Sequence, residues 1–177
     1  GGDVGKTAVD SLARLKGKGV SEAIMKTLAG VDAGSKAILI GSLAERQSPE
    51  VVGELMKYAD DPDESVKGET MKSLGALISQ KEIPVLIGMM LKTQPGRVQT
   101  AAEQAVQAAC AKIKGEGKRI EPLVAAMKDA GVEGRAVILH CLGRLGGEKA
   151  LEIVRTNIKD KDEKVQESAI RALADWM

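Results

Sequence analysis

The stretch VKGETMKSLGAL at residues 66–77 decides the fold of this chain. Its residues Val66, Thr70, Leu74 and Leu77, at offsets of 0, 4, 8 and 11, lie along one face of a helix. The same register occurs five more times, and the residues that match Leu74 in those copies are Leu12, Leu43, Val106, Leu142 and Leu173. Successive central residues are 31, 31, 32, 36 and 31 positions apart. A near-constant period of this length is typical of a helical repeat protein.

A second apolar helix precedes every copy except the first. Its apolar residues fall 19 and 15 positions before each central residue, and this spacing of four again marks one helical face. The residues of these two columns are Ile24 and Leu28, Leu55 and Ala59, Ile87 and Leu91, Leu123 and Met127, and Val154 and Ile158. Turn-forming residues such as Pro62 and Pro95-Gly96 follow this helix. Each repeat is therefore predicted to be a hairpin of a first helix, a short turn and a second helix.

The predicted fold class is all-α, with about five helical hairpins plus an unpaired first helix in a single array over residues 1–177. The register helix spans 4–16, and the hairpins span about 20–47, 49–79, 82–113, 119–146 and 148–177. We expect Pro49, Pro84 and Pro122 in or near the first turn of a first helix, where a missing N–H is tolerated. The aromatic residues are Tyr58 and Trp176 alone, so aliphatic side chains must build the core.

The repeats resemble HEAT repeats, in which the second helix begins with an Asp-x-Asp-x-x-Val-Arg-like stretch and ends near Ala-Leu-Gly. Residues 61–67 read DPDESVK and lead to SLG at 73–75, and residues 160–166 read DKDEKVQ and lead to ALA at 172–174. The resemblance implies a right-handed α-α superhelix, a HEAT-like solenoid, whose second helices line the concave surface.

The two ends of the chain suggest a longer parent protein. Residues 169–176, AIRALADW, resemble the close of HEAT repeats in large bacterial multidomain proteins, some of which also carry a sugar-hydrolase-like domain. The chain opens at Gly1-Gly2-Asp3 without Met, and its first helix lacks a partner helix. We therefore expect a fragment of a larger bacterial multidomain protein that continues in both directions.

The resemblance also implies a ladder of charged residues between neighbouring repeats. In the family this ladder joins the first Asp of the stretch to the basic residue. Asp61 with Lys67, and Asp129 with Arg135, keep both members. The positions that depart from the pattern are Gly30, Thr93, Gln99 and Gln166. A partial ladder with a structural role is the expectation.

A polar row runs along the second helices, opposite the buried register. It consists of Asp10, Gly41, Lys72, Gln104, His140 and Arg171. By the resemblance this row faces the concave groove. Two interpretations stay open: a solvated polar row, or a basic strip in the C-terminal half of the groove that binds a partner. Lys72, Gln104, His140 and Arg171 are thus candidate partner-binding residues.

Glu103 and Gln107 join these candidates because they make the second helix of the third repeat unusually polar. The column of Glu103 is otherwise apolar and consists of Val9, Ile40, Met71, Leu139 and Ile170. A carboxylate in such a column must be paired or exposed. Either a rotated or lengthened helix leaves Glu103 in water, which is the favoured interpretation, or Glu103 belongs to a polar contact site in mid-groove.

Cys110 and Cys141 are expected to be small core residues without a disulfide between them. Cys141 shares a column of small residues with Ser42 and Ser73. The longest spacing, 36, indicates an insertion at residues 114–119, KGEGKR, which we expect to form a loop. This basic, Gly-rich loop is either a flexible insertion or an edge contact.

Composition argues against several classes of function. Lys and Arg number 26 and Asp and Glu 25, so the net charge is +1, and aromatics make up 1%. Binding of nucleic acid favours a basic groove with aromatic residues for stacking. No apolar run reaches the ~18–20 residues that span a bilayer. One His and two Cys fit no usual metal site, and no nucleophile is paired with a base, so we predict no metal, no cofactor and no enzyme activity.

The predicted function is a non-catalytic protein–protein interaction scaffold that binds a protein or peptide through the concave face. One alternative is a structural spacer between neighbouring domains of a larger, carbohydrate-active bacterial protein. It is favoured by Ala44, Gly75, Gly143 and Ala174, small residues of one groove-facing column. Another is a lyase-like HEAT enzyme subunit. The compartment stays open between the cytoplasm and a bacterial periplasm or cell envelope.

Overall fold

The apolar registers fold into helices joined by short turns in a computed structural model of the chain, which describes residues 7, 11, 12, 14, 15, 17 and 19–176. This described part contains no strand. It divides into two compact units. Unit 1 comprises the described residues up to Ile78 together with Thr93–Ala105, and unit 2 comprises Ser79–Lys92 together with the described residues from Val106 onward.

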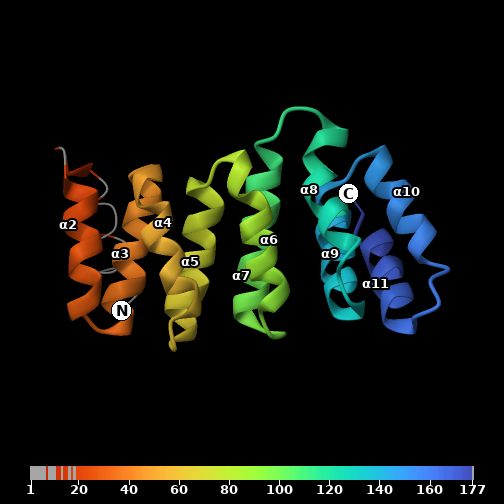
Figure 1. Cartoon of the computed structure of the whole chain (residues 1–177), viewed down its shortest axis with the longest axis horizontal. Coiled ribbons are helices and arrows are strands. Elements are labelled where there is room, and N and C mark those ends of the chain that lie inside the picture. The colour runs from red at the N-terminus through yellow and green to blue at the C-terminus, as the bar shows by residue number, and fades with distance from the viewer. Residues whose placement is uncertain (1–6, 8–10, 13, 16, 18, 177) are drawn as a thin grey trace. The chain divides into compact units, whose positions relative to one another are not determined.

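Unit 1 contains two complete hairpins in its described part. The first consists of α2 (Val20–Thr27), the short 3-10 helix η1 (Leu28–Gly30) and α3 (Ala33–Glu45). In the second, η2 (Pro49–Val51), α4 (Val52–Leu55) and η3 (Met56–Asp60) precede α5 (Glu64–Leu77). The second helices α3 and α5 lie side by side (Figure 1). The N-terminal part of α7 (Arg97–Ala111) also belongs to this unit.

Unit 2 begins with η4 (Gln80–Glu82) and α6 (Ile83–Lys92) and includes the C-terminal part of α7. Two hairpins follow, α8 (Glu116–Met127) with α9 (Val132–Leu145) and α10 (Glu148–Asn157) with α11 (Glu163–Ala174). Helix α11 packs along α9, as Figure 1 shows. The prediction of an all-α fold of about five hairpins is confirmed. The single array over residues 1–177 stays a prediction.

The predicted helix over residues 4–16 lies largely outside the described residues. In the part of this segment that the structure describes, the Ser11 hydroxyl donates a hydrogen bond to the Thr7 carbonyl, 2.8 Å away. Arg46 at the end of α3 donates to the carbonyls of Leu12 and Leu15, at 2.8 and 2.7 Å. These carbonyls lie at the end of the predicted helix, where backbone acceptors are left over for side-chain donors, and the Leu12 carbonyl also accepts from the Leu15 N–H at 3.3 Å. Arg46, which interrupts the apolar register of its repeat, therefore binds the preceding segment.

The core consists of the predicted columns. The central residues Leu43 and Leu74 in unit 1 and Val106 and Leu142 in unit 2 are fully buried. The column 19 positions earlier is buried throughout, from Ile24 to Val154. The column 15 positions earlier is buried at Leu28 and Ala59 but only half-buried at Leu91, Met127 and Ile158.

Asp residues begin three of the second helices, as the resemblance implies. The carboxylates of Asp32, Asp63 and Asp162 accept hydrogen bonds from backbone N–H groups in the first turns of α3, α5 and α11. Such N-caps satisfy donors that the helix itself leaves without partners. The second Asp of the stretch, which is kept in all three repeats, therefore sets where each of these second helices starts.

Two glycines set close contacts between second helices. A Cβ atom on Gly75 of α5 would lie 2.6 Å from the Ala105 Cα of α7, and one on Gly143 of α9 would lie 2.9 Å from the Ala172 Cβ of α11. Both glycines are buried. The expectation that the column faces the groove is wrong for these two glycines, because each packs against the small residue of the following repeat. The other members of the column differ, since Ala44 is half-buried and Ala174 is exposed.

Helix α8 starts earlier than predicted. Its N-cap, Gly115, has a φ of 94°, and the helix begins at Glu116, so the insertion loop covers 112–115 rather than 114–119. Pro122 consequently lies inside α8 instead of in its first turn, whereas Pro49 and Pro84 lie at helix starts as expected. The Glu116 carboxylate accepts a hydrogen bond from the Glu148 N–H at 2.5 Å, which fixes this additional turn against the start of α10.

Candidate protein-binding surface

In unit 1 the polar row of the second helices is exposed at Lys72 on α5 and Gln104 on α7. The Lys72 side chain is 75% exposed, and its Nζ lies 3.4 Å from the Glu69 Oε1 of the same helix. Glu69 also covers Gly41 of α3, since a Cβ there would lie 2.9 Å from the same oxygen. An exposed ion pair of this kind is weak, so Lys72 can exchange Glu69 for a carboxylate of a partner.

In unit 2 the row continues on α9 and α11. Arg171 is 78% exposed, with Nη2 3.4 Å from the Glu167 Oε2 one turn earlier. His140 on α9 is half-buried, and so is Gln107 in the C-terminal part of α7. Because α9 and α11 pack together, His140 and Arg171 belong to neighbouring helices of one unit.

Glu103 is buried, with 9% of its surface exposed. The favoured prediction that water surrounds it is therefore wrong. Helix α7 keeps the register of the other second helices, since Ala102, Val106 and Ala109 are all buried. The helix is not rotated, and Glu103 stays in the buried column of its repeat. Of the six candidate residues, it alone is excluded from the exposed surface.

The partial ladder is present, but between other residues than those expected. Lys36 Nζ lies 3.1 Å from Asp61 Oδ2 in unit 1, and Arg135 is paired with Asp160 in unit 2. Each pair joins the basic position of one repeat to the Asp of the next, 25 residues later. The sequence holds a signal for Lys36, because it follows Gly30 at the distance at which Lys67 follows Asp61.

Both ladder carboxylates have a lowered pKa. For Asp61 the main cause is the hydrogen bond from the Asp63 N–H, and Lys36 contributes after it. For Asp160 the hydrogen bond from Arg135 comes first and the one from the Asp162 N–H second. Hydrogen bonds to the charged form favour ionisation. The ladder therefore stabilises the turns and the contacts between repeats.

The two cysteines are free and buried, as expected. Burial raises the pKa of the Cys110 thiol to about 11. Cys141 Sγ lies 3.8 Å from Met90 Sδ, inside unit 2. Both thiols are therefore core groups rather than nucleophiles. In the described part of the chain, no group of His, Cys, Asp and Glu has an arrangement that could hold a metal ion.

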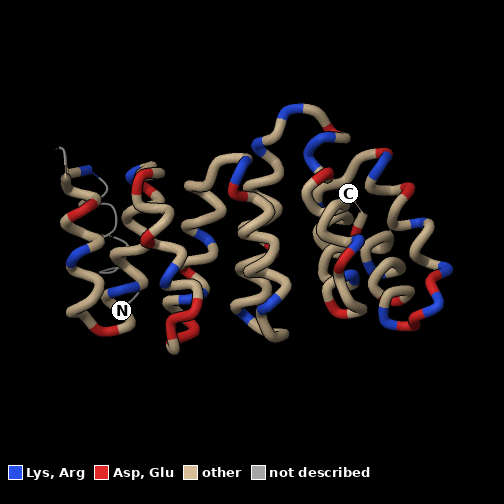
Figure 2. Tube along the Cα trace, in the orientation of Figure 1, with Lys and Arg blue, Asp and Glu red and all other residues tan. Residues whose placement is uncertain are grey.

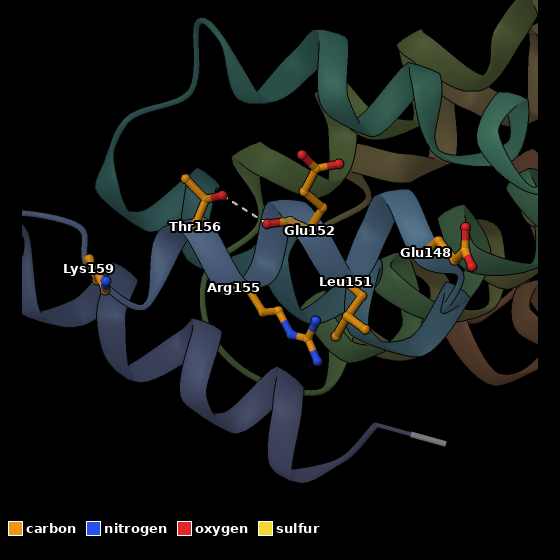
Figure 3. Close-up of a pocket in the computed structure, with 6 residues that line it drawn as sticks. All are labelled: Glu148, Leu151, Glu152, Arg155, Thr156 and Lys159. Carbon is orange, nitrogen blue, oxygen red and sulfur yellow. Dashed lines mark hydrogen bonds between the residues drawn. The ribbon is translucent and has the colours of Figure 1, made fainter.

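Two shallow surface grooves lie on the first helices, one in each unit. The groove of unit 1 has a volume of about 480 Å³ and is lined by Glu22, Met25, Lys26, Glu50, Val51, Glu54, Lys57 and Tyr58. The groove of unit 2, about 730 Å³, is lined by Glu148, Leu151, Glu152, Arg155, Thr156 and Lys159. All six come from α10 and the turn after it, and the Thr156 hydroxyl donates to the Glu152 carbonyl at 2.9 Å (Figure 3). The second groove is thus an exposed helix face with charges of both signs.

No described helix is long and apolar enough to cross a membrane.

Comparison with known proteins supports the repeats. A family model described as HEAT repeats matches residues 21–107. The match runs from the first residues of α2 into α7. No curated protein matches the chain. HEAT repeats generally mediate contacts between proteins and are typically non-catalytic.

Proposed function

Because the chain is a HEAT-repeat protein, we propose that it is a non-catalytic scaffold that binds a protein or peptide through its second helices. The contact residues are Lys72 and Gln104 in unit 1 and Gln107, His140 and Arg171 in unit 2. The observation that carries this proposal is the exposure of Lys72 and Gln104 in unit 1 and of Arg171 in unit 2, with Lys72 and Arg171 each about three-quarters exposed. Repeated helices of this kind present extended surfaces to a partner.

The exposed row suits a polar protein surface. Among the residues that the structure describes, Lys72 and Arg171 form weak ion pairs on their own helices, so a partner carboxylate replaces an existing contact at little cost. The amide groups of Gln104 and Gln107 and the imidazole of His140 can both donate and accept hydrogen bonds. The spacer hypothesis loses its main support, because Gly75 and Gly143 are buried between repeats and tell nothing about the groove.

Affinity capture with paired baits tests the proposal. The chain and its Lys72→Glu/Arg171→Glu variant are used on lysate of the source organism. We expect a protein that the unaltered chain retains and the variant loses. The matched control is Lys26→Glu/Arg155→Glu, which reverses one exposed cation on a first helix in each unit. This control should retain the same protein.

Equal capture by all three baits would refute binding through the second helices. Loss by both variants alike would indicate a general effect of net charge and would also refute the proposal. If no bait retains a protein, a spacer between domains becomes the better explanation. Each variant is compared with the unaltered chain by circular dichroism, so that loss of folding is not mistaken for loss of binding.

A further inference from the structure

The insertion loop and the first turn of α8 in unit 2 carry a concentration of positive charge. Lys112 and Lys114 lie in the loop, and Lys118 and Arg119 follow in the helix. All but the half-buried Arg119 are exposed. Figure 2 shows the blue of Lys and Arg along the arch between α7 and α8.

A fifth cation, Lys149, lies next to the first turn of α8 and belongs to another helix, α10. A Cβ atom on Gly117 would lie 3.0 Å from Lys149 Nζ, so the Lys149 ammonium of α10 lies against the first turn of α8. The hydrogen bond from the Glu148 N–H to Glu116 holds the same two segments together. We call the exposed cations Lys112, Lys114, Lys118 and Lys149 the loop patch.

Carboxylates near the loop patch do not cancel its charge. Glu116 lies in the first turn of α8, and one of its oxygens is occupied by the Glu148 N–H at 2.5 Å. Glu121 and Glu148 are also exposed. The three glutamates are still fewer than the four lysines of the loop patch. Mutual repulsion of exposed cations is unfavourable unless an anionic group comes between them.

The packing of the repeats does not require the residues of the insertion between α7 and α8. The spacing across the insertion is 36, whereas every other spacing is 31 or 32. The hairpin of α8 and α9 after the insertion packs with the ordinary register, since Leu123 is buried like its counterparts Ile24, Leu55, Ile87 and Val154. Apart from the buried Ile113, the residues of the loop present charge to solvent.

We propose that the loop patch is a docking site for an acidic segment of a partner protein, rich in Asp and Glu. The proposal rests on the scaffold function above and adds to it a second surface and the chemistry of the partner. Charge complementarity supports an acidic peptide, whose carboxylates can interleave with separated ammonium groups. A nucleic acid fits less well, because residues 59–175 contain no Phe, Tyr or Trp for stacking on bases.

Fluorescence anisotropy with a labelled peptide of Glu and Ser tests this proposal on the full chain. We expect saturable binding that weakens as salt is added, because exposed charge pairs are screened. The variant Lys114→Glu/Lys118→Glu/Lys149→Glu should bind about 10-fold more weakly or worse, since attractions become repulsions. Lys112 stays unaltered because burial lowers its pKa, which indicates a partly structural role.

The matched control is Lys128→Glu/Arg155→Glu/Lys159→Glu, which changes the net charge equally at exposed positions of unit 2. Its affinity should stay within about 2-fold of the unaltered chain. The milder Lys114→Gln/Lys118→Gln/Lys149→Gln variant should lose affinity in the same direction, and it serves where charge reversal impairs folding. Absence of binding by the unaltered chain, or an equal loss in patch and control variants, would overturn the proposal.

Two further arms separate this proposal from its competitors. A single-stranded oligonucleotide that binds the loop patch more tightly than the peptide would overturn the assignment to an acidic peptide. A loss of peptide binding in Lys72→Glu/Arg171→Glu would move the site to the row of the second helices and also overturn it. Failure of the peptide experiment leaves the capture experiment unaffected, because the two use different variants and different readouts.

Discussion

At the scale of single residues, Thr70 shows how an unsatisfied polar group limits stability. Its side chain is fully buried in α5, and its hydroxyl has no hydrogen-bond partner among the described residues. A buried hydroxyl without a partner costs about 1–3 kcal/mol, and valine has nearly the same shape. We expect Thr70→Val to raise the free energy of unfolding by about 1 kcal/mol, measured by urea unfolding.

Thr70→Ser is the control for this prediction. It keeps the hydroxyl and removes the buried methyl group, so it should lower the stability by about 1 kcal/mol. A Thr70→Val variant less stable than the unaltered chain would contradict the account, because it would indicate that the hydroxyl contributes favourably to folding.

The cysteines allow a chemical test of the core. Cys110 and Cys141 are buried, and the pKa of Cys110 is raised to about 11 by burial. Only the thiolate reacts readily with disulfide reagents. We expect both thiols to resist Ellman's reagent at pH 8 in the native chain and to react fully in urea. Rapid modification of either thiol in the folded chain would contradict its place in the core.

At the scale of elements, the contact of α5 with α7 in unit 1 depends on the absence of a side chain. The Cβ of a Gly75→Ala variant would lie 2.6 Å from the Ala105 Cα, a backbone atom that cannot move alone. We expect this variant to lose about 1–3 kcal/mol of stability by urea unfolding.

Gly68 of the same helix provides a matched control. Nothing lies within 4 Å of a Cβ at this position, so the substitution adds no clash. Alanine has the higher helix propensity, and Gly68→Ala should therefore stabilise the chain by about 0.5–1 kcal/mol. A Gly→Ala substitution should thus lower the free energy of unfolding at Gly75 and raise it at Gly68. Equal effects would refute the close contact at Gly75.

The ladder predicts a dependence of stability on pH. The pKa of Asp61 and Asp160 is lower in the folded chain than in the unfolded chain, by the hydrogen bonds described above. Their contribution is therefore present above the unfolded pKa of about 4 and is lost as the pH falls through the folded pKa. Asp61→Asn and Asp160→Asn should lower the urea midpoint at pH 7 and have a smaller effect at about pH 3.

Asp60→Asn is the comparison for this pH series. Asp60 is exposed and forms no ion pair among the described residues, so its substitution should change the midpoint little at either pH. A constant difference between Asp61→Asn and the unaltered chain across the pH range would show that the charge of Asp61 is irrelevant.

Most elements could be predicted from the sequence because burial imposes a strict period. The spacing of Leu43, Leu74 and Leu142 revealed the second helices, and the Asp N-caps marked their starts. The start of α8 could not be found in this way, since its first turn is held by a hydrogen bond to Glu148, 32 residues away. Gly75 was also misplaced, because apolar periodicity reports which face is buried but not which neighbour covers it.

At the scale of the whole molecule, the repeats explain the candidate surface only in part. The row of Lys72, Gln104, His140 and Arg171 followed from the helical period and is exposed or half-buried. The burial of Glu103 was not predicted, because a carboxylate favours an exposed position. In the structure the register of α7 places Glu103 inside. Charge alone was thus a poorer guide than position in the repeat.

The central claim, that a partner protein binds along the second helices, is tested most directly by hydrogen exchange. Amide exchange is measured on the chain alone and with the protein that it captures. We predict that the partner slows exchange in α5 of unit 1, in α9 and α11 of unit 2, and in α7, which carries Gln104 and Gln107. Protection confined to the first helices α2, α8 and α10, with unchanged exchange in the second helices, would contradict the claim.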